Sequence, residues 1–279
     1  YMFVLPAVLF FVCICILPMF YALGLGFFRE TYGTFAFCGT ANFRALFSDA
    51  DFGQALFNTV LYALITIPAG LAVSLFFAVI LDSGIRYTGF WRTVFFSPAV
   101  TTPAAIGYIW LWMYEPHKGL FVHLLNGLGL PSAGFLTDPD TALVSIAVVR
   151  IWMFLGFQTV IFVAGLQAIP EELYQAARVD SASAWQRFRH ITLTLLNPTI
   201  VFLVIIGTIK TFQMFTEVYV MTDNGGPLGS TRTIVYLIQQ TAFSSHRKGY
   251  AAAMTVVLFL MIMTLTLLQM KVISRKAEY

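Results

Sequence analysis

The stretch LFNTVLYALITIPAGLAVSLFFAVIL, residues 56–81, contains no charged side chain over 26 positions. A membrane-spanning helix needs about 20 predominantly apolar residues. Comparable apolar runs recur along the chain, and we predict spans at about 2–28, 56–81, 93–114, 141–169, 198–222 and 250–270. These runs predict one all-α, polytopic domain over residues 1–279, with about six transmembrane helices.

The composition agrees with lipid as the solvent of the chain. Hydrophobic residues make up 59% of the sequence and charged residues only 10%, whereas an ordinary soluble domain has roughly 25% charged residues. One water-soluble core cannot hide so much apolar surface, which argues against a globular enzyme. The net charge of +3 is spread over many short segments, so we do not expect nucleic acid as a partner.

The basic residues predict how the chain is oriented in the membrane. Segments 82–92 and 170–197 and the tail from Lys271 are short and basic, and by the positive-inside rule they should face the cytoplasm. Both termini are then inside, and segments 29–55, 115–140 and 223–249 are outside. The uncharged stretch 119–137 is predicted to be an outer amphipathic segment and not a seventh span. The cytoplasmic prediction rests on Arg86, Arg92, Arg178, Arg187, Arg189, Lys271, Arg275 and Lys276.

Prolines lie inside three of the predicted spans. Membrane helices tolerate them when neighbouring groups satisfy the freed carbonyls, so we expect kinks and no breaks. The residues are Pro18, Pro68, Pro98 and Pro103.

Motifs for covalent chemistry and for tightly bound cofactors are missing. The nearest imitation of a phosphate-binding loop, GGPLGSTR at 225–232, lacks the lysine that contacts the phosphates. The four histidines lie outside the spans, no H-E-x-x-H motif occurs, and Cys13, Cys15 and Cys38 are expected to be free thiols. We therefore predict no catalytic residue, no metal site and no cofactor on this chain.

The most informative stretch is PEELYQAARVDSASAWQRFRHITLTLLNP, residues 170–198. Pro170 followed by two glutamates is a favourable helix start, and Ser183 with Gln186 has the spacing of a capping box. The pattern predicts two short helices joined by a turn near Asp180 to Ser183, with Trp185 and Phe188 on one face. An amphipathic segment lying on the membrane surface is the alternative.

This stretch resembles the coupling motif of membrane subunits of binding-protein-dependent ABC importers. That motif reads E-A-A, then D-G-A three residues on, then I-x-L-P. Here Gln175, Ser181 and Thr194 stand where the family usually has Glu, Gly and Pro. The resemblance implies that this helical segment docks into a separate ATPase. The matching positions are Gln175, Ala176 and Ala177, then Asp180, Ser181 and Ala182, then Ile191 and Leu193.

Further stretches resemble the carbohydrate branch of these importers, in particular the larger permease of maltose-type systems. They include CGTANF at 38–43, GFWRTVFFSP at 89–98, AGLQAIP at 164–170 and YVMTDNGGP at 219–227. The resemblance implies a type I permease in a bacterial inner membrane. Its implied partners are a second related permease, two copies of an ATP-binding subunit that holds ATP and Mg, and an extracytoplasmic solute-binding protein. The transport mechanism implied is alternating access.

The only charged residues well inside the predicted spans are Arg150, Lys210 and Glu217. Such charges are costly in lipid unless they are paired or face a watery cavity. One interpretation is an ion pair between Arg150 and Glu217 that joins two helices. The other is a solute path, since the resemblance implies that the helices before and after the coupling motif contact the solute. Its residues would be Arg150, Phe154, Phe157, Thr211 and Gln213.

Two other functional classes remain open at this point. A self-sufficient secondary transporter or channel would explain six helices but not the helix–turn–helix at 170–198. If the chain were a structural subunit of a respiratory complex, the ATPase activity of its partner would not depend on a solute. The solute itself also remains open among mono-, di- and oligosaccharides, polyols and glycerol phosphate.

Overall fold

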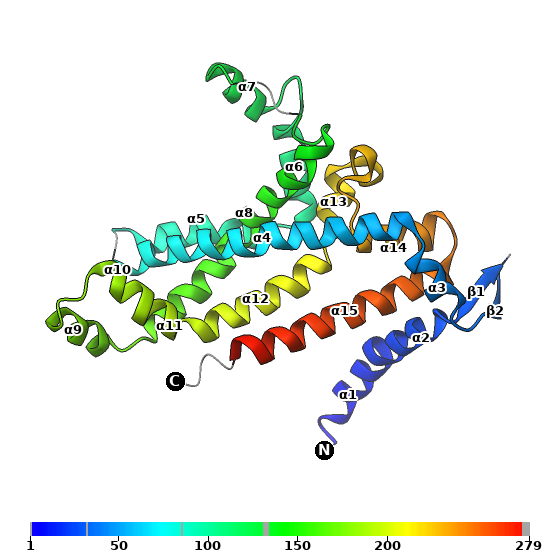
Figure 1. Ribbon diagram of the computed structural model, residues 1–279, viewed down its shortest axis with the longest axis horizontal. Coiled ribbons are helices and arrows are strands. Elements are labelled where there is room, and N and C mark those ends of the chain that lie inside the picture. The colour runs from blue at the N-terminus through cyan, green and yellow to red at the C-terminus, as the bar shows by residue number, and fades with distance from the viewer. Residues whose placement is uncertain (1, 32, 85, 131–133, 275–279) are drawn as a thin grey trace.

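A computed structural model describes residues 2–31, 33–84, 86–130 and 134–274, and these residues form mainly helices (Figure 1). The all-α prediction is therefore confirmed. The predicted basic tail residues Arg275 and Lys276 lie outside the described residues. One antiparallel hairpin was not predicted: β1 (Phe28–Thr31) pairs with β2 (Thr34–Phe37), and Phe28 lies opposite Phe37.

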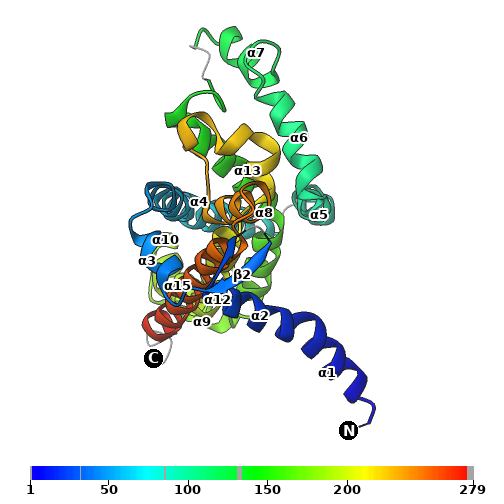
Figure 2. The ribbon, with the colours of Figure 1, turned by 90° about the vertical axis from the view of Figure 1, so that its right-hand side faces the viewer.

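The first predicted span is a helical run over Leu5–Leu25. It consists of α1 (Leu5–Phe11), a π-helical turn (Val12–Ile16) and α2 (Leu17–Leu25). Pro18 falls at the start of α2 and leaves the run unbroken. The α1 part of this run projects away from the other helices, whereas α2 lies beside them (Figure 2), and none of the run's apolar window is buried within the chain.

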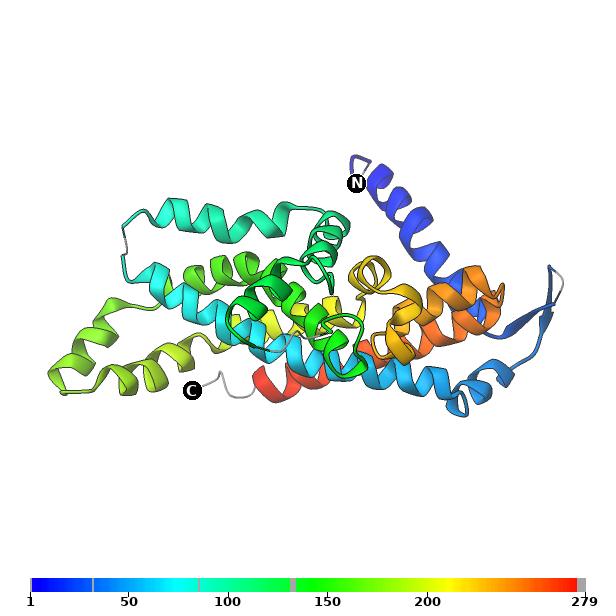
Figure 3. The same ribbon diagram turned by 90° about the horizontal axis from the view of Figure 1, so that it is seen from above.

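Three more helices are long and apolar enough to cross a membrane: α4 (Ala50–Asp82), α8 (Pro139–Gln167) and α15 (Lys248–Ser274). α4 packs along α8, and α15 packs against α2 and α12 (Asn197–Phe212). Two further spans arise among the described residues if each bent helix pair counts as one, which gives up to six. Short helices α3 (Ala41–Phe47) and α14 (Ile234–Gln239), with a π-helical turn (Gln240–Ser244), complete the end that carries the hairpin (Figure 3).

The predicted span 93–114 is broken, so the expectation of a simple kink was wrong. α5 (Thr88–Val100) and α6 (Pro103–Met113) meet at 99°. A residue before proline is pushed towards extended backbone, and Thr102 has φ −64° and ψ 135°. Pro98, in contrast, is accommodated inside α5. After α6, the stretch predicted to be an outer amphipathic segment contains the short helix α7 (Leu120–Gly127).

The predicted span 198–222 is also interrupted. α12 ends at Phe212, and the chain becomes helical again in α13 (Thr216–Met221). Phe215 between them has φ −137° and ψ −54°, outside the helical region. No proline or glycine marks this break in the sequence. Tertiary contacts compensate for it, because the hydroxyl of Thr233 donates to the carbonyl of Met214 at 3.0 Å.

Beyond α13, the chain makes two 3₁₀ turns (Asp223–Gly225 and Pro227–Gly229) that are fastened to the start of α4. The Gln54 amide donates to the carbonyl of Leu228 at 2.9 Å, and the Asn58 amide donates to that of Gly229 at 2.8 Å. Arg232 forms an ion pair with Asp51 at 2.8 Å. Segments about 175 residues apart in sequence are thereby joined at one end of the molecule.

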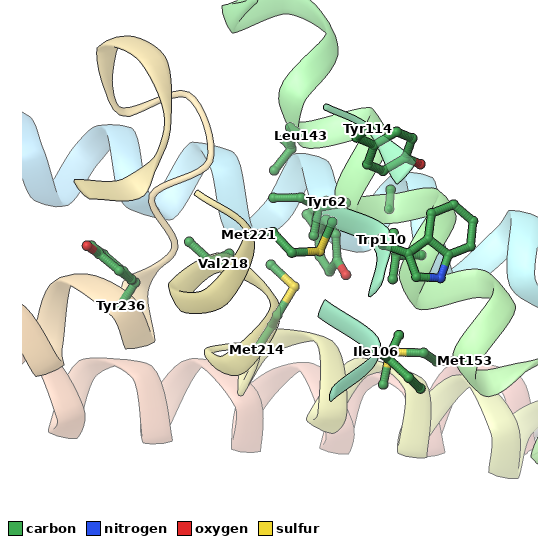
Figure 4. Packing of buried hydrophobic residues seen from close by; sticks show 13 residues of the cluster. Tyr62, Ile106, Trp110, Tyr114, Leu143, Met153, Met214, Val218, Met221 and Tyr236 are labelled. Carbon is green, nitrogen blue, oxygen red and sulfur yellow. The ribbon is translucent and has the colours of Figure 1, made fainter. Parts of the chain in front are cut away.

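A buried cluster holds the broken helices against the long ones (Figure 4). Tyr62 of α4 is 0% exposed and Trp110 of α6 is 9% exposed. Met153 of α8, Met214 in the break and Met221 of α13 complete the contact between the four helices. Large aromatic side chains and flexible thioethers fill the irregular space that two bent helices leave between them.

α5 approaches α8 closely at Gly156. A Cβ atom built on Gly156 would overlap the backbone carbonyl of Phe95 in α5, so only glycine fits there. Small residues at helix contacts let backbones approach in this way in membrane proteins. A Cβ atom on Gly53 in α4, in contrast, would meet no atom within 4 Å.

We therefore expect Gly156→Val to push α5 away from α8 and to lower the free energy of unfolding by about 1–3 kcal/mol or more. The thermal unfolding midpoint of the detergent-purified protein measures this effect. Gly53→Ala is the matched control and should leave the midpoint unchanged or raise it, since alanine favours helix. An unchanged midpoint for Gly156→Val would show that the α5–α8 contact is absent.

Candidate functional site

The 170–197 segment folds as the predicted helix–turn–helix and lies at one end of the molecule (Figure 1). α9 (Glu171–Val179) is followed by α10 (Ala184–Arg187), a π-helical turn (Phe188–Thr192) and α11 (Leu193–Leu195). The capping box is present, with the Ser183 hydroxyl accepting from the Gln186 amide N–H and the Gln186 side chain accepting from the Ser183 N–H. The second arm then meets α12 at 62°, just before Pro198.

The turn between α9 and α10 depends on a left-handed residue. Ser181 has φ +57°, its N–H donates to Arg178, and the Ala182 N–H donates back to the Ala177 carbonyl at 2.9 Å. This pattern is a Schellman motif, whose left-handed position is most often glycine. The left-handed backbone explains why the coupling motif usually has glycine at this position. Ser181 adopts the same backbone geometry.

Side-chain contacts brace the two arms of this segment. The hydroxyls of Tyr174 in α9 and Thr192 lie 2.9 Å apart and share a hydrogen bond. Trp185 stacks on Phe188 with ring centroids 5.7 Å apart, on one face as predicted. Arg187 donates to the Ala182 carbonyl at 2.6 Å. The segment is therefore a preformed unit although most of its surface is exposed.

A shallow cavity of about 330 Å³ opens between the two arms. Four of the six predicted coupling residues line it, namely Ala177, Asp180, Ser181 and Ala182. The other two, Gln175 and Ala176, are exposed on α9 and do not line this cavity. His190, which was not predicted as a coupling residue, also lines it.

A second cavity, of about 470 Å³, lies where both broken helices meet α8, and we call it the intramembrane cavity. The α5–α6 junction contributes one wall, α8 another, and the α12–α13 junction the third. Its lining combines aromatic and aliphatic side chains with a few polar ones. The residues are Phe96, Pro98, Ala99, Thr101, Pro103, Arg150, Met153, Phe154, Phe157, Ile206, Lys210, Gln213, Met214, Phe215, Thr216 and Glu217.

Four of the five residues predicted for the solute path line this cavity: Arg150, Phe154, Phe157 and Gln213. The first three lie at helical spacing on α8, and the rings of Phe154 and Phe157 meet edge to face with centroids 6.5 Å apart. Thr211 does not line it. Its side chain is 4% exposed and borders a pocket of only about 20 Å³ between α4, α8 and α12.

Arg150 forms the ion pair with Glu217 that was one of the two interpretations. Its Nη1 lies 2.6 Å from Oε1 of Glu217, and the two side chains are 11% and 3% exposed. Its Nη2 donates to the carbonyl of Lys210 at 3.1 Å, near the end of α12. The guanidinium also lies over the Phe154 ring, 4.0 Å from the centroid. Arg150 therefore both forms the ion pair and lines the cavity.

The wall of the cavity that α5 and α6 supply was not predicted from the sequence. Phe96, Thr101 and Pro103 were placed inside a continuous span, where no cavity was expected. The signal that could have found them is Thr102-Pro103, because the residue before proline leaves the helix. Lys210 was recognised as an intramembrane charge but was not assigned to the path.

Residues 52–279 match the model of a family described as "Binding-protein-dependent transport system inner membrane component". The match covers well over half of the chain. This chain belongs to that family. It is a multi-pass membrane permease subunit of an ABC importer and does not itself hydrolyse ATP. The alternatives of a secondary transporter and of a respiratory subunit are thereby set aside.

Two relatives illustrate the range of this permease family. The lactose transport system permease protein LacF of Rhizobium radiobacter is 33% identical over 274 residues, which cover 96% of this chain and 92% of the relative. The sn-glycerol-3-phosphate transport system permease protein UgpA of Agrobacterium fabrum is 32% identical over 244 residues, which cover 87% and 83%.

The fold of this permease is also that of a solved structure. A chain of a bacterial alginate ABC transporter, in complex with an alginate pentasaccharide-bound periplasmic protein, aligns with a TM-score of 0.86. The alignment covers 100% of this chain and 94% of the other at 22% identity. At this identity the likeness concerns the fold.

The buried ion pair of this permease makes a stability prediction. We expect Arg150→Met to lower the free energy of unfolding by about 3–5 kcal/mol, because Glu217 is left as an unpaired buried charge. The double variant Arg150→Met with Glu217→Gln should show a smaller decrease in the free energy of unfolding, since neither residue of the pair then carries a buried charge. Thermal unfolding in detergent compares the two. A double variant as unstable as the single one would contradict the pairing.

Proposed function

We propose that this permease subunit forms part of the translocation path for a sugar or a related small polar solute, and that the solute passes through the intramembrane cavity. The observation that carries the proposal is the position of this cavity at the junction of two discontinuous helices. Transporters often build solute sites from such helices, because interrupted helices offer free backbone groups within the membrane.

The chemistry of the lining suits a sugar. Phe154 and Phe157 offer aromatic faces on which a sugar ring can stack, and Gln213 and Thr216 offer polar groups for hydroxyls. The names of the relatives LacF and UgpA, which concern lactose and sn-glycerol 3-phosphate, agree with a polyhydroxylated solute. The alginate pentasaccharide on the periplasmic protein of the solved alginate transporter complex agrees as well.

We assign ATPase docking to Gln175, Ala176, Ala177, Asp180, Ser181 and Ala182, with ATP and Mg held by the partner ATPase. Support comes from the preformed helix–turn–helix and the shallow cavity between its arms. The small side chains of Ala177 and Ala182 on that cavity permit close approach of a partner. Movement of this rigid unit with the ATPase would tilt α12, which continues directly from it.

We further propose the complete assembly: this chain with a second related permease, two ATP-binding subunits and an extracytoplasmic solute-binding protein, in a bacterial inner membrane. No residue in the apolar window of the run Leu5–Leu25 is buried within this chain, which is compatible with lipid or a second permease around it. The basic segments 82–92 and 170–197 support a cytoplasmic position for the coupling end.

The solute path is tested by Phe157→Ala and Gln213→Ala. Each change removes a lining group, so transport in proteoliposomes should fall several-fold while the companion subunits still co-purify. Phe76→Ala is the matched control, because Phe76 is 61% exposed on α4 and away from the cavity. Transport unaffected by both cavity changes would overturn the path and leave the Arg150–Glu217 pair as a purely structural feature.

Coupling is tested separately by Ala177→Glu. A larger, charged side chain on the cavity between the arms should block docking, so the ATPase should no longer co-purify or respond to solute, although the permease still inserts. Ala177→Ser keeps a small side chain and serves as the control. Full solute-stimulated ATPase activity in Ala177→Glu would refute the assignment of the coupling residues.

A further inference from the structure

The charges that line the intramembrane cavity do not cancel. Arg150 and Glu217 neutralise each other at 2.6 Å and are almost fully buried. Glu217 is the only acidic residue among the lining residues. Lys210 lines the same cavity, which leaves it with one net positive charge.

Lys210 is not paired within the part of the chain that the structure describes. None of the ion pairs found among these residues includes it, and Lys210 is exposed and lines the cavity. It lies in the last turn of α12, where a cation is favourable beside the free carbonyls. Arg150, however, already donates to the Lys210 carbonyl at that helix end. The ammonium group is therefore available to another anion.

The opposite wall adds to the positive character. Thr101 and Pro103 line the cavity at the start of α6, an eleven-residue helix whose N-cap Thr102 makes no side-chain capping bond. The N-terminus of a helix carries a partial positive charge. The partial charge at the start of α6 adds to the positive charge of Lys210, and by itself it would not make an anion site.

From this placement we infer that the path is selective for a solute with an anionic group, that is, a sugar or polyol bearing one carboxylate or one phosphate. The inference rests on the proposed function of the intramembrane cavity and specifies its solute class. An ammonium group binds either anion as a point charge. The aromatic side chains Phe154 and Phe157 would contact the uncharged part of the same solute.

The first test measures the charge of the cavity and needs no known solute. In the assembled complex, the native cysteines Cys13, Cys15 and Cys38 are replaced by alanine and Gln213 by cysteine. We measure the rate at which this introduced cysteine reacts with the anionic reagent sulfonatoethyl methanethiosulfonate and with its cationic trimethylammonium analogue. The ratio of the anionic to the cationic rate is then divided by the same ratio for a small thiol in solution. This normalised ratio should exceed one, and it should fall about tenfold when Lys210→Gln is added.

The matched control is Lys118→Gln, which removes the same charge from a residue outside the lining. It should leave the rate ratio unchanged, and Lys210→Arg should keep it high. A starting ratio of one, or no fall with Lys210→Gln, would overturn the inference. Loss of the second permease on purification of Lys210→Gln would also overturn it, because Lys210 would then pair with an acid of that subunit.

The second test compares uptake of galactose with galacturonate, and of glycerol with sn-glycerol 3-phosphate, by the complete transporter in proteoliposomes. The two pairs distinguish a carboxylate from a phosphate. We expect an acidic member to be preferred, and its uptake to fall about tenfold in Lys210→Gln but not in Lys210→Arg. If Phe157→Ala impairs uptake of a neutral member and Lys210→Gln does not, the path stands and the anionic solute is refuted. If neither change impairs uptake, the path itself fails.

Discussion

Arg150 contacts two elements that the chain has separated. One guanidinium nitrogen reaches Glu217 in α13 and the other reaches the Lys210 carbonyl near the end of α12. A helix interrupted within a membrane leaves backbone groups that lipid cannot satisfy. Because a single side chain from α8 serves both sides of the interruption, the break is held at a fixed place. Arg150 and Glu217 also line the cavity, and α6 packs on the α13 helix that Arg150 holds.

The two breaks have different origins and a common result. Thr102-Pro103 interrupts α5–α6 through local backbone chemistry, whereas α12–α13 is interrupted by contacts from Arg150 and Thr233. Both breaks open onto the same wall of α8. Coupling could act on this region through α12, because α12 connects the 170–197 segment at one end with the cavity at the other. One helix therefore joins the segment that we assign to ATPase docking with the cavity that we assign to the solute path.

Features set by local sequence could be predicted, whereas features set by long-range contacts could not. Apolar runs located the spans because length and hydropathy are local properties, and the capping box of Ser183 and Gln186 located the helix–turn–helix. Arg150, Phe154 and Phe157, which the family resemblance assigned to a solute path, lie on one wall of the cavity. The α12–α13 break could not be predicted from Gln213, Met214 and Phe215, which are all compatible with helix. It depends on partners 60 residues upstream and 19 residues downstream.

The length of α4 has a mechanical consequence. Its 33 residues rise about 50 Å, whereas the hydrocarbon layer is about 30 Å thick. The excess carries the end that holds Asp51 and Gln54 beyond the acyl chains, even if the helix tilts. The two turns fastened there are raised with it. A long, regular helix, and not a flexible loop, therefore sets the height of this face above the lipid headgroups.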